Sequence, residues 1–142
     1  MTSDDVEFVK NLEIECSLSN WSEKDYDNEI ARDDAFALII STKNRKIGFL
    51  IARILEAESE SEVEIYNLAI SPEQQNQGFG QVLMTDLINR CSKINITKIW
   101  LEVRKSNEKA IKFYERNAFV EIGKRKNFYT NPAEDAILMC RT

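Results

Sequence analysis

The amino-acid sequence predicts an α/β fold: a single domain with a mixed β-sheet and helices on both of its faces. The chain has 142 residues, the size of one ordinary domain with one hydrophobic core. Its 43% hydrophobic and 30% charged residues are typical of a folded globular protein. Strand-like and helix-like stretches alternate through the centre of the chain, which favours a sheet covered by helices. We therefore treat residues 1–142 as one domain.

The first half of the chain contains two predicted helices and then three predicted strands. Apolar residues recur at helical spacing from Val6 to Cys16, and Ser22 is a candidate N-cap for a second helix. The runs AFALIIST and IGFLIARIL flank the turn residues KNRK, which predicts a β-hairpin with Asn44 at its tip. A charged connector, EAESESE, leads to the strand EVEIYNLAIS, which ends before Pro72.

The second half alternates strands and helices. An apolar stripe from Leu83 to Cys91 indicates a helix, TKIWLEVR reads as a strand, and Ser106 or Asn107 caps the next helix. Asn117 is a candidate left-handed residue at the end of that helix. The predicted elements, in order, are helices in 6–16 and 23–30, strands 35–42, 47–55 and 62–71, a helix from about Gly80, strand 97–104, helix 106–117, and strands 118–129 and 134–142. No clear strand precedes the first helix.

Composition excludes several kinds of site. The sequence has no histidine, which removes Ser-His-Asp and Cys-His nucleophilic chemistry and leaves carboxylate, lysine, tyrosine or cysteine as a general base. The three cysteines, Cys16, Cys91 and Cys140, are far apart, so we expect buried thiols, with no disulfide framework and no metal site. No apolar run reaches the roughly 20 residues of a membrane span, and the acidic start lacks signal-peptide features. We expect a cytoplasmic protein with no membrane contact, and a monomer by default.

The net charge of −5 limits the partners that the chain can take. It argues against direct nucleic-acid binding through a basic face and suits a basic substrate or partner. An anionic ligand would have to be held by local groups against this overall charge.

The segment Gln75-Asn76-Gln77-Gly78-Phe79-Gly80 joins a predicted strand to a predicted helix. Backbone N–H groups and the positive end of a helix can together hold a diphosphate, and glycine lets the backbone approach it closely. The alternative is a tight turn in which glycine serves only the backbone angle. The segment has neither the third glycine of a Rossmann loop nor the lysine of a Walker loop.

Two later elements carry candidate catalytic groups. In the strand IWLEVR, alternation places Glu102 on the face opposite Leu101. A carboxylate with apolar neighbours near the end of a central strand can have a raised pKa and act as a general base, although a surface glutamate would show the same pattern. In the next helix, Asn107 and Tyr114 share one face at positions i and i+7. A tyrosine on such a stripe is otherwise a core residue with a paired hydroxyl.

Three motifs in this order resemble the GNAT acetyltransferase superfamily, and within it the RimI-type ribosomal-protein alanine N-acetyltransferases. They are NLAISPEQQNQGFG, WLEVRKSNEKAIKFYERNAF and RKNFYTNPAEDAILM, and the resemblance runs from about Trp21 to Met139. It implies the GNAT fold, a mixed and mostly antiparallel central sheet of about six strands flanked by about four helices. It also implies acetyl-CoA as co-substrate, no metal, and transfer to the N-terminal α-amine of a protein, such as alanine on a small-subunit ribosomal protein.

The resemblance implies a role for each matching residue. Glu102 matches the general base and Tyr114 the general acid. The acetyl-CoA-binding residues it implies are Leu68, Ala69 and Ile70 at the strand end, Gln75, Asn76, Gln77, Gly78, Phe79, Gly80 and Gln81 in the loop and helix start, and Asn107. In relatives the strand end pairs with the pantetheine arm and offers an N–H, here that of Ile70, to the thioester oxygen.

The chemistry of the acceptor favours an α-amine independently. An α-amino group has a pKa near 7.7–8.0, so its deprotonation at pH 7 costs only about 1–1.4 kcal/mol. A lysine side chain, with a pKa near 10.4, would cost about 4.6 kcal/mol before any bond formed. A glutamate acting directly or through water is adequate for the first case. Burial of a lysine could narrow this difference, so acylation of a lysine side chain stays an alternative.

The sequence departs from the family at several positions. Ala118 and Phe128 stand where relatives have glycine and tyrosine, and the N-terminus is short. The Phe128 departure puts the acceptor's identity in doubt because that segment lies toward the peptide side in relatives. Glu64 is a rival general base, since other branches of the superfamily place their carboxylate there. A GNAT enzyme for a small-molecule amine and a non-catalytic acyl-CoA-binding module remain the alternative functions.

Overall fold

The order of helices and strands in the structure is the one that the sequence predicts. The computed structural model describes residues 1–16, 18 and 21–142. Its main elements are α1 (Val6–Glu15), α2 (Glu23–Ile30), β1 (Ala35–Thr42), β2 (Arg45–Leu55), β3 (Glu62–Ile70), α3 (Phe79–Lys93), β4 (Ile99–Arg104), α4 (Glu108–Arg116), β5 (Val120–Tyr129) and β6 (Glu134–Arg141). Short 3₁₀ turns at Ser3–Asp5 and Pro72–Gln74 precede α1 and α3. The first of them, and not a strand, leads into α1.

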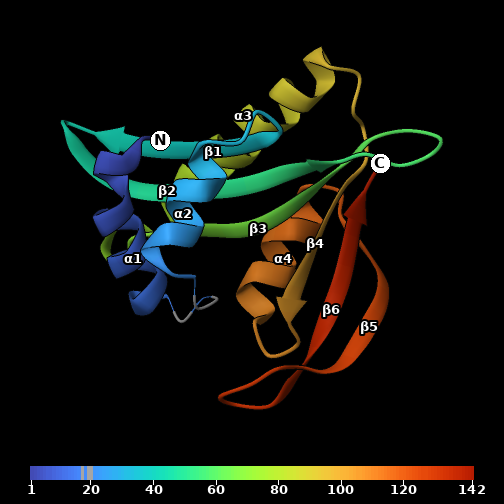
Figure 1. Cartoon of the computed structure of the whole chain (residues 1–142). Helices are drawn as coiled ribbons and strands as arrows, with labels where there is room; N and C mark the ends of the chain where they lie inside the picture. Colours follow the sequence, from blue (N-terminus) through green and yellow to red (C-terminus); the bar gives the residue numbers. More distant parts are fainter. Residues whose placement is uncertain (17, 19–20) are drawn as a thin grey trace.

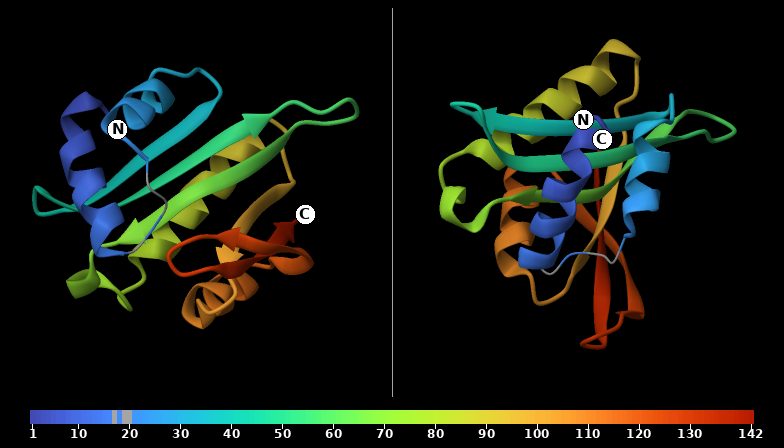
Figure 2. Two further views of the ribbon diagram at one scale, coloured as in Figure 1. Left: turned by 60° about the horizontal axis from the view of Figure 1, so that its bottom comes forward. Right: turned by 60° about the vertical axis from the view of Figure 1, so that its left-hand side comes forward.

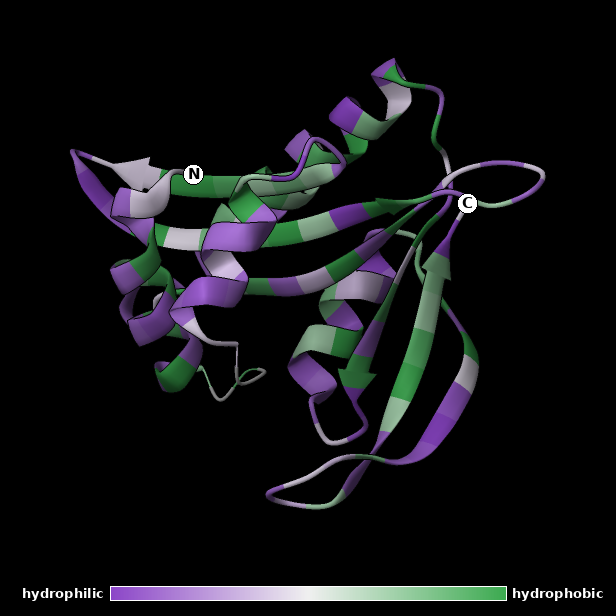
Figure 3. Ribbon diagram, in the orientation of Figure 1, coloured by the Kyte–Doolittle hydropathy of each residue, from purple (hydrophilic) through white to green (hydrophobic). Residues whose placement is uncertain are grey.

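The six strands form one sheet in the order β1-β2-β3-β4-β6-β5. All neighbours are antiparallel except β3 and β4, which are parallel, as a mixed and mostly antiparallel sheet requires. Helices α1 and α2 cover one face and α3 and α4 the other (Figures 1 and 2). Each face has its own apolar core, one under α3 and α4 and one under α1 and α2. In Figure 3, β6 is mostly hydrophobic, whereas β5, at the edge of the sheet, is largely hydrophilic. The predicted mixed, mostly antiparallel sheet of six strands flanked by four helices is confirmed over the part of the chain that the structure describes.

The sheet opens between its two parallel strands. Pairing of β3 with β4 covers only Val63–Ile65 opposite Ile99–Leu101. Just beyond that stretch, the register of β2 against β3 shifts and leaves Tyr66 as an extra residue in β3. Such a bulge bends the strand, so β3 turns away from β4. Figure 1 shows β1–β3 and β4–β6 as two arms of a V that meet near the C-terminus. The end of β3, from Leu68 to Ile70, therefore lies in the gap and is not paired with β4.

Local signals account for the starts and turns of the elements. Ser22 caps α2, because its Oγ accepts a hydrogen bond from the Asp25 N–H at 3.1 Å. Lys43 and Asn44 form the tip of the β1–β2 hairpin, and both have the positive φ of a two-residue hairpin turn. α3 begins at Phe79, one residue before the expected Gly80.

The left-handed residue after α4 is Ala118, and the expectation that Asn117 would take this position was wrong. Ala118 has φ 66°, whereas Asn117 stays at φ −98°. Asn117 is held in place because its amide donates to the Phe113 carbonyl at 3.0 Å, while its own carbonyl accepts from Arg141 at 2.7 Å. The reversal of the chain therefore falls on the next residue, where relatives have glycine.

Replacing Ala118 by glycine is expected to stabilise the protein. A non-glycine residue in the left-handed region destabilises the folded state by about 1–2 kcal/mol. Glycine removes this strain, but it gives the unfolded chain more conformational freedom, which lowers stability by about 0.4–1 kcal/mol. We expect a net gain of about 0.5–1 kcal/mol, seen as a rise in Tm of about 2–4 °C or less. Ala133→Gly, at an exposed residue without a positive φ, is the control and should not stabilise. A lower Tm for Ala118→Gly would contradict the explanation.

No helix in the described part of the chain is long and apolar enough to cross a membrane.

Candidate functional site

A cavity of about 680 Å³ lies beside the end of β3, where β3 is no longer paired with β4. Its walls are the end of β3, the loop before α3 with the first turn of α3, one face of α4, and Glu15, Cys16 and Leu18 at and after the end of α1. Every residue predicted for the site lines this cavity except Gln77 and Glu102. The predicted residues that line it are Leu68, Ala69, Ile70, Gln75, Asn76, Gly78, Phe79, Gly80, Gln81, Asn107 and Tyr114. Three segments that are far apart in the sequence therefore meet at one cavity.

The start of α3 offers free backbone donors to the cavity. Gly78, with φ 86°, is the residue before the helix and has no side chain that could cap it. The first helical hydrogen bond of this turn runs from the Val82 N–H to the Gly78 carbonyl at 3.2 Å. The N–H groups that precede Val82 in the helix are those that no earlier turn can satisfy, and they carry the positive end of the helix dipole. This arrangement suits a phosphate group.

Lys109 and Arg116 bring positive charge to the same cavity, which the sequence argument missed. The sequence pattern had pointed only to backbone donors for an anion. Lys109 and Arg116 lie seven positions apart in α4 and therefore share one face of the helix. This spacing is visible in the sequence, whereas the net charge of −5 gives no sign of a local cationic pair. The cavity thus has backbone dipoles and two cationic side chains.

Side-chain contacts to the Ile70 carbonyl hold the end of β3 in place. The Gln75 amide donates to the Ile70 carbonyl at 3.0 Å, and Lys109 donates to the other end of the same amide at 3.0 Å. Gln75 thereby connects β3 to α4 across the cavity. The Cys16 thiol also contacts the Ile70 carbonyl, at 3.7 Å, and Cys16 lines the cavity instead of being fully buried as Cys91 and Cys140 are. This contact spans 54 residues, so the sequence alone gave no signal for it.

Asn107 caps α4 and also lines the cavity. Its side-chain oxygen accepts a hydrogen bond from the Ala110 N–H at 3.2 Å and so caps α4. The residue is exposed and lines the cavity. The amide NH₂ group is a donor that capping does not use.

Tyr114 extends from α4 into the core beneath the cavity. It is only 8% exposed and its ring packs against Phe113 and Phe119, with centroid distances of 5.5 and 5.6 Å. Burial raises the pKa of Tyr114 above its usual value, and the nearby Tyr129 raises it further. The hydroxyl is therefore protonated at neutral pH, which is the state that a proton donor needs.

Glu102 lies outside the cavity, on the other face of β4. Its neighbours Leu101 and Val103 belong to the core under α3 and α4, so alternation turns Glu102 toward the face that carries α1 and α2. Its side chain is 10% exposed, and burial raises the pKa of the carboxyl group, partly offset by Arg125 at 3.4 Å. Its Oε2 is buried and, within the described residues, accepts no hydrogen bond. An acceptor oxygen in this state is suited to a proton from a ligand.

Glu64 lies close enough to Glu102 for their charges to interact. Burial raises the pKa of Glu64, the Tyr66 hydroxyl offsets part of this by a hydrogen bond, and the charge of Glu102 raises it again. Glu64 is paired with Trp100 across β3 and β4, two residues before Glu102. Both candidate bases therefore face the same side of the sheet.

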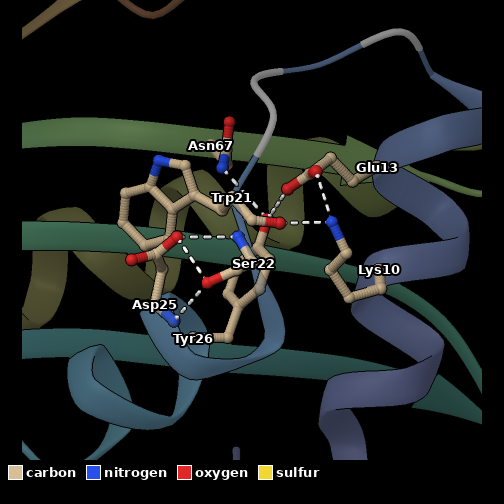
Figure 4. A network of polar contacts seen from close by, with 7 residues as sticks. All are labelled: Lys10, Glu13, Trp21, Ser22, Asp25, Tyr26 and Asn67. Atoms are coloured by element: carbon tan, nitrogen blue, oxygen red, sulfur yellow. Dashed lines mark hydrogen bonds and ion pairs between the residues drawn. The ribbon is translucent and has the colours of Figure 1, made fainter.

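A buried polar network joins α1, α2 and β3 on that side (Figure 4). The Tyr26 hydroxyl donates to Glu13, whose carboxylate also pairs with Lys10 at 3.1 Å. Asn67, which follows the bulge in β3, donates to the Tyr26 hydroxyl at 3.3 Å, and Lys10 donates to the Trp21 carbonyl. Glu13 is 2% exposed, so its charge needs these partners. The network fixes the start of α2 relative to β3.

Gln77, a predicted site residue, does not line the cavity, and several residues that were not predicted do. Gln77 points elsewhere, since its amide donates to the Glu73 carbonyl at 3.4 Å. The cavity-lining residues that the sequence argument did not name for the site are Glu15, Cys16, Leu18, Pro72, Gln74, Lys109, Ala110, Phe113 and Arg116. Four of them are α4 positions within the second quoted motif for which the resemblance implied no role, and Glu15, Cys16 and Leu18 lie outside every quoted motif.

Comparison with known proteins gives consistent matches. The model of the acetyltransferase (GNAT) family matches residues 6–119. The chain is 35% identical over 139 residues to a [ribosomal protein bS18]-alanine N-acetyltransferase of Escherichia coli (strain K12), covering 95% of this chain and 89% of the relative. The crystal structure of the E. coli ribosomal-protein-S18-alanine N-acetyltransferase matches with a TM-score of 0.87 and 29% identity, over 99% of this chain and 89% of that one. Arabidopsis thaliana Naa50, in complex with the bisubstrate analogue CoA-Ac-MVNAL, matches with a TM-score of 0.87 and 25% identity, over 100% of this chain and 95% of that one.

Proposed function

The chain belongs to the acetyltransferase (GNAT) family, and from this premise we propose that it acetylates the N-terminal α-amine of a protein with acetyl-CoA as donor. We propose alanine as the first residue of the acceptor and a ribosomal protein such as bS18 as the acceptor itself, which the likeness to bS18-alanine N-acetyltransferases supports. The cytoplasm, where ribosomal proteins are made, is the proposed location. The observation that carries the proposal is the cavity at the end of β3, which is lined both by the uncapped start of α3 and by Tyr114.

The cavity fits acetyl-CoA by the chemistry of its walls. The diphosphate suits the N–H groups at the start of α3 together with Lys109 and Arg116. The end of β3 is paired with β2 on one edge but not with β4 on the other, and this second edge suits the amide-bearing pantetheine arm, because an extended chain can add to a free strand edge. Gly80 lines the cavity and brings no side chain to its wall, although a Cβ at this position would meet only ordinary contacts, at 3.7 Å from Phe113.

The proposed mechanism needs two proton transfers and one oxyanion donor from the chain. Acetyl-CoA supplies the acyl group and a thiolate leaving group. Glu102 takes a proton from the acceptor ammonium, directly or through water, and so frees the nitrogen lone pair for attack on the acyl carbon. The Ile70 N–H donates to the acyl oxygen while it carries negative charge. Tyr114 donates its proton to the departing sulfur and regains one from the acylated nitrogen, and Glu102 releases its proton to solvent. No bond forms between enzyme and acyl group.

The two proposed catalytic groups lie on different faces of β4, and the opening of the sheet explains how they can act together. Where β3 has left β4, no neighbouring strand separates the face bearing Glu102 from the cavity reached by Tyr114. An acceptor on the α1 and α2 side can therefore meet a thioester held in the cavity. Glu64 is the alternative base on this same side.

A peptide assay tests the proposal. Release of free CoA is measured with peptides that begin with alanine, and with matched N-blocked peptides that contain lysine. We expect turnover only with the free α-amine. Turnover confined to the blocked, lysine-containing peptides would refute the α-amine assignment, and turnover confined to small amines such as polyamines would indicate a small-molecule enzyme. Binding of CoA without any turnover would indicate a non-catalytic module.

Replacing Gly80 by valine is expected to raise the KM for acetyl-CoA by about tenfold or more. The added side chain would project from the loop where the diphosphate lies, while its Cβ meets only ordinary contacts, at 3.7 Å from Phe113 and 3.9 Å from Ile70. The Tm should fall little, since glycine is the poorer helix former. Gly123→Val on β5, where a Cβ has nothing within 4 Å, is the matched control and should leave the KM unchanged. If Gly80→Val lowered stability as strongly as binding, the loop would be only a structural turn.

A further inference from the structure

We propose that Asn117 is a positioning residue for acetyl-CoA, because it anchors the first turn of α3 to the end of α4. The inference rests on the proposed function, since it takes acetyl-CoA as the ligand of the cavity. The partner of Asn117 is Gln81, and neither side-chain amide needs to contact the ligand. The pair acts by fixing the positions of the backbone N–H donors of α3.

The anchor is a reciprocal pair of side-chain amides between Gln81 and Asn117. The Gln81 NH₂ group donates to Asn117 Oδ1 at 2.8 Å, and the Asn117 NH₂ group donates to Gln81 Oε1 at 3.0 Å. Gln81 follows Gly80 in the first turn of α3, and Asn117 is the residue at which α4 ends. The pair therefore joins the two helices that form opposite walls of the cavity.

Asn117 is a rigid partner in this pair. It is 7% exposed, and its amide also donates to the Phe113 carbonyl at 3.0 Å. Arg141 of β6 donates to its backbone carbonyl at 2.7 Å. These contacts fix Asn117 on α4 and on the sheet, so Gln81 is held against a fixed point.

The start of α3 needs such an anchor because it has no cap of the usual kind. A capping side chain would accept hydrogen bonds from the first N–H groups and would stabilise the turn by about 1 kcal/mol. Gly78 cannot do this, and the first turn of α3 contains no acidic residue. A cap would also occupy the donors that we assign to the diphosphate. The lateral amide pair holds the turn in place and leaves these donors free.

This arrangement explains why Gln81 belongs to the site although its side chain is engaged elsewhere. Without the pair, the first turn of α3 would lose its side-chain connection to α4 and would sample more positions. Ordering it again on binding would cost affinity for acetyl-CoA. The chemical step, which depends on Glu102 and Tyr114, would proceed as before once the donor is bound.

Titration of the whole chain with CoA tests the anchor. Gln81→Ala, Asn117→Ala and the double variant are compared with the unchanged chain by calorimetry, and the KM for acetyl-CoA is measured alongside kcat and the acceptor KM. We expect each single variant to weaken CoA binding and raise the acetyl-CoA KM by about fivefold to tenfold. We expect kcat at saturation and the acceptor KM to stay within about twofold. The double variant should be no worse than the worse single variant, because both lose the same contact.

The controls separate positioning from simple folding and from the proposed function. Thr85→Ala removes the other side-chain partner of Gln81, an acceptor at 3.1 Å, and should leave CoA binding unchanged. Because Gln81 is exposed, Gln81→Ala tests the anchor even if Asn117→Ala does not fold. Equal CoA affinity of Gln81→Ala and the unchanged chain, or additive losses in the double variant, would overturn the anchor alone. Failure of the unchanged chain to bind CoA would overturn the proposed function as well.

Discussion

Replacing Glu102 by glutamine is expected to lower kcat/KM for an alanine-initiated peptide by about 10²-fold or more, the usual contribution of a general base. Glutamine keeps the size of the side chain but cannot take a proton. The KM for acetyl-CoA should stay unchanged, since Glu102 does not line the cavity. Steady-state kinetics with both substrates varied provide the measurement.

The pH dependence gives a sharper test of the same role. Burial raises the pKa of Glu102, so the carboxylate is lost as the pH falls through a value above its usual 4.5. The acceptor amine is protonated below about 7.7–8.0. Because the reacting pair is the Glu102 carboxylate and the acceptor ammonium, the logarithm of kcat/KM should rise with slope one below the pKa of Glu102, stay level up to about pH 8, and fall above it. In Glu102→Gln the rise through the pKa of Glu102 should be absent. Removing Arg125 should move it to higher pH, because Arg125 lowers this pKa.

Glu64→Gln is the matched control for Glu102→Gln. It removes a carboxylate of the same length from the same face of the sheet, and Glu64 interacts with Glu102 by charge. We expect less than a tenfold loss. A larger loss than that of Glu102→Gln would reverse the two assignments and make Glu64 the base.

Tyr114→Phe is expected to reduce kcat by about 10²-fold, because the leaving thiolate would lose its proton donor. The ring keeps its contacts with Phe113 and Phe119, so the Tm should change little. Since burial raises the pKa of Tyr114, the unchanged enzyme should show no loss of kcat from this hydroxyl at mildly alkaline pH. Rates at saturating acetyl-CoA, with the Tm of each variant, are the measurements.

A second tyrosine provides the comparison for Tyr114→Phe. Tyr66 lies near Glu64 and lowers the pKa of that carboxyl, on the other side of the sheet, so Tyr66→Phe removes a hydroxyl that the mechanism does not use. Its kcat should stay within about threefold. A Tyr114→Phe enzyme with near-normal kcat would show that the thiolate leaves without help from this residue.

Local patterns in the sequence were sufficient for the order of the elements and for the faces on which three candidate site residues lie. The order of helices and strands followed from hydrophobic periodicity, and the cap at Ser22 followed from residue type. Alternation in β4 correctly separated Glu102 from the core-facing Leu101. The helical spacing of Asn107 and Tyr114 correctly placed both on the face of α4 that lines the cavity.

Features that depend on distant contacts were not predictable in this way. The extra residue Tyr66 in β3 arises from register against β2, and no local pattern marks it. Cys16 reaches Ile70 across 54 positions of the chain. The interactions of Asn117 with Gln81 and Arg141 decided which residue turns left-handed, and these partners lie 36 and 24 positions away. A prediction from α4 alone could not weigh them.

Because the β3–β4 pairing is short, the stability of the folded protein should depend on whether its acyl donor is bound. Three residue pairs are the backbone connection between the two halves of the sheet. Under the proposed function, acetyl-CoA binds next to this junction and stabilises the contact between the two halves of the sheet while it is bound. A ligand at 100 times its Kd adds about 2.7 kcal/mol to the free energy of unfolding, a large share of the 5–15 kcal/mol typical of a domain. Bound acetyl-CoA should therefore raise the Tm of the enzyme and slow its proteolysis, to a degree that grows with how far the donor concentration exceeds its Kd.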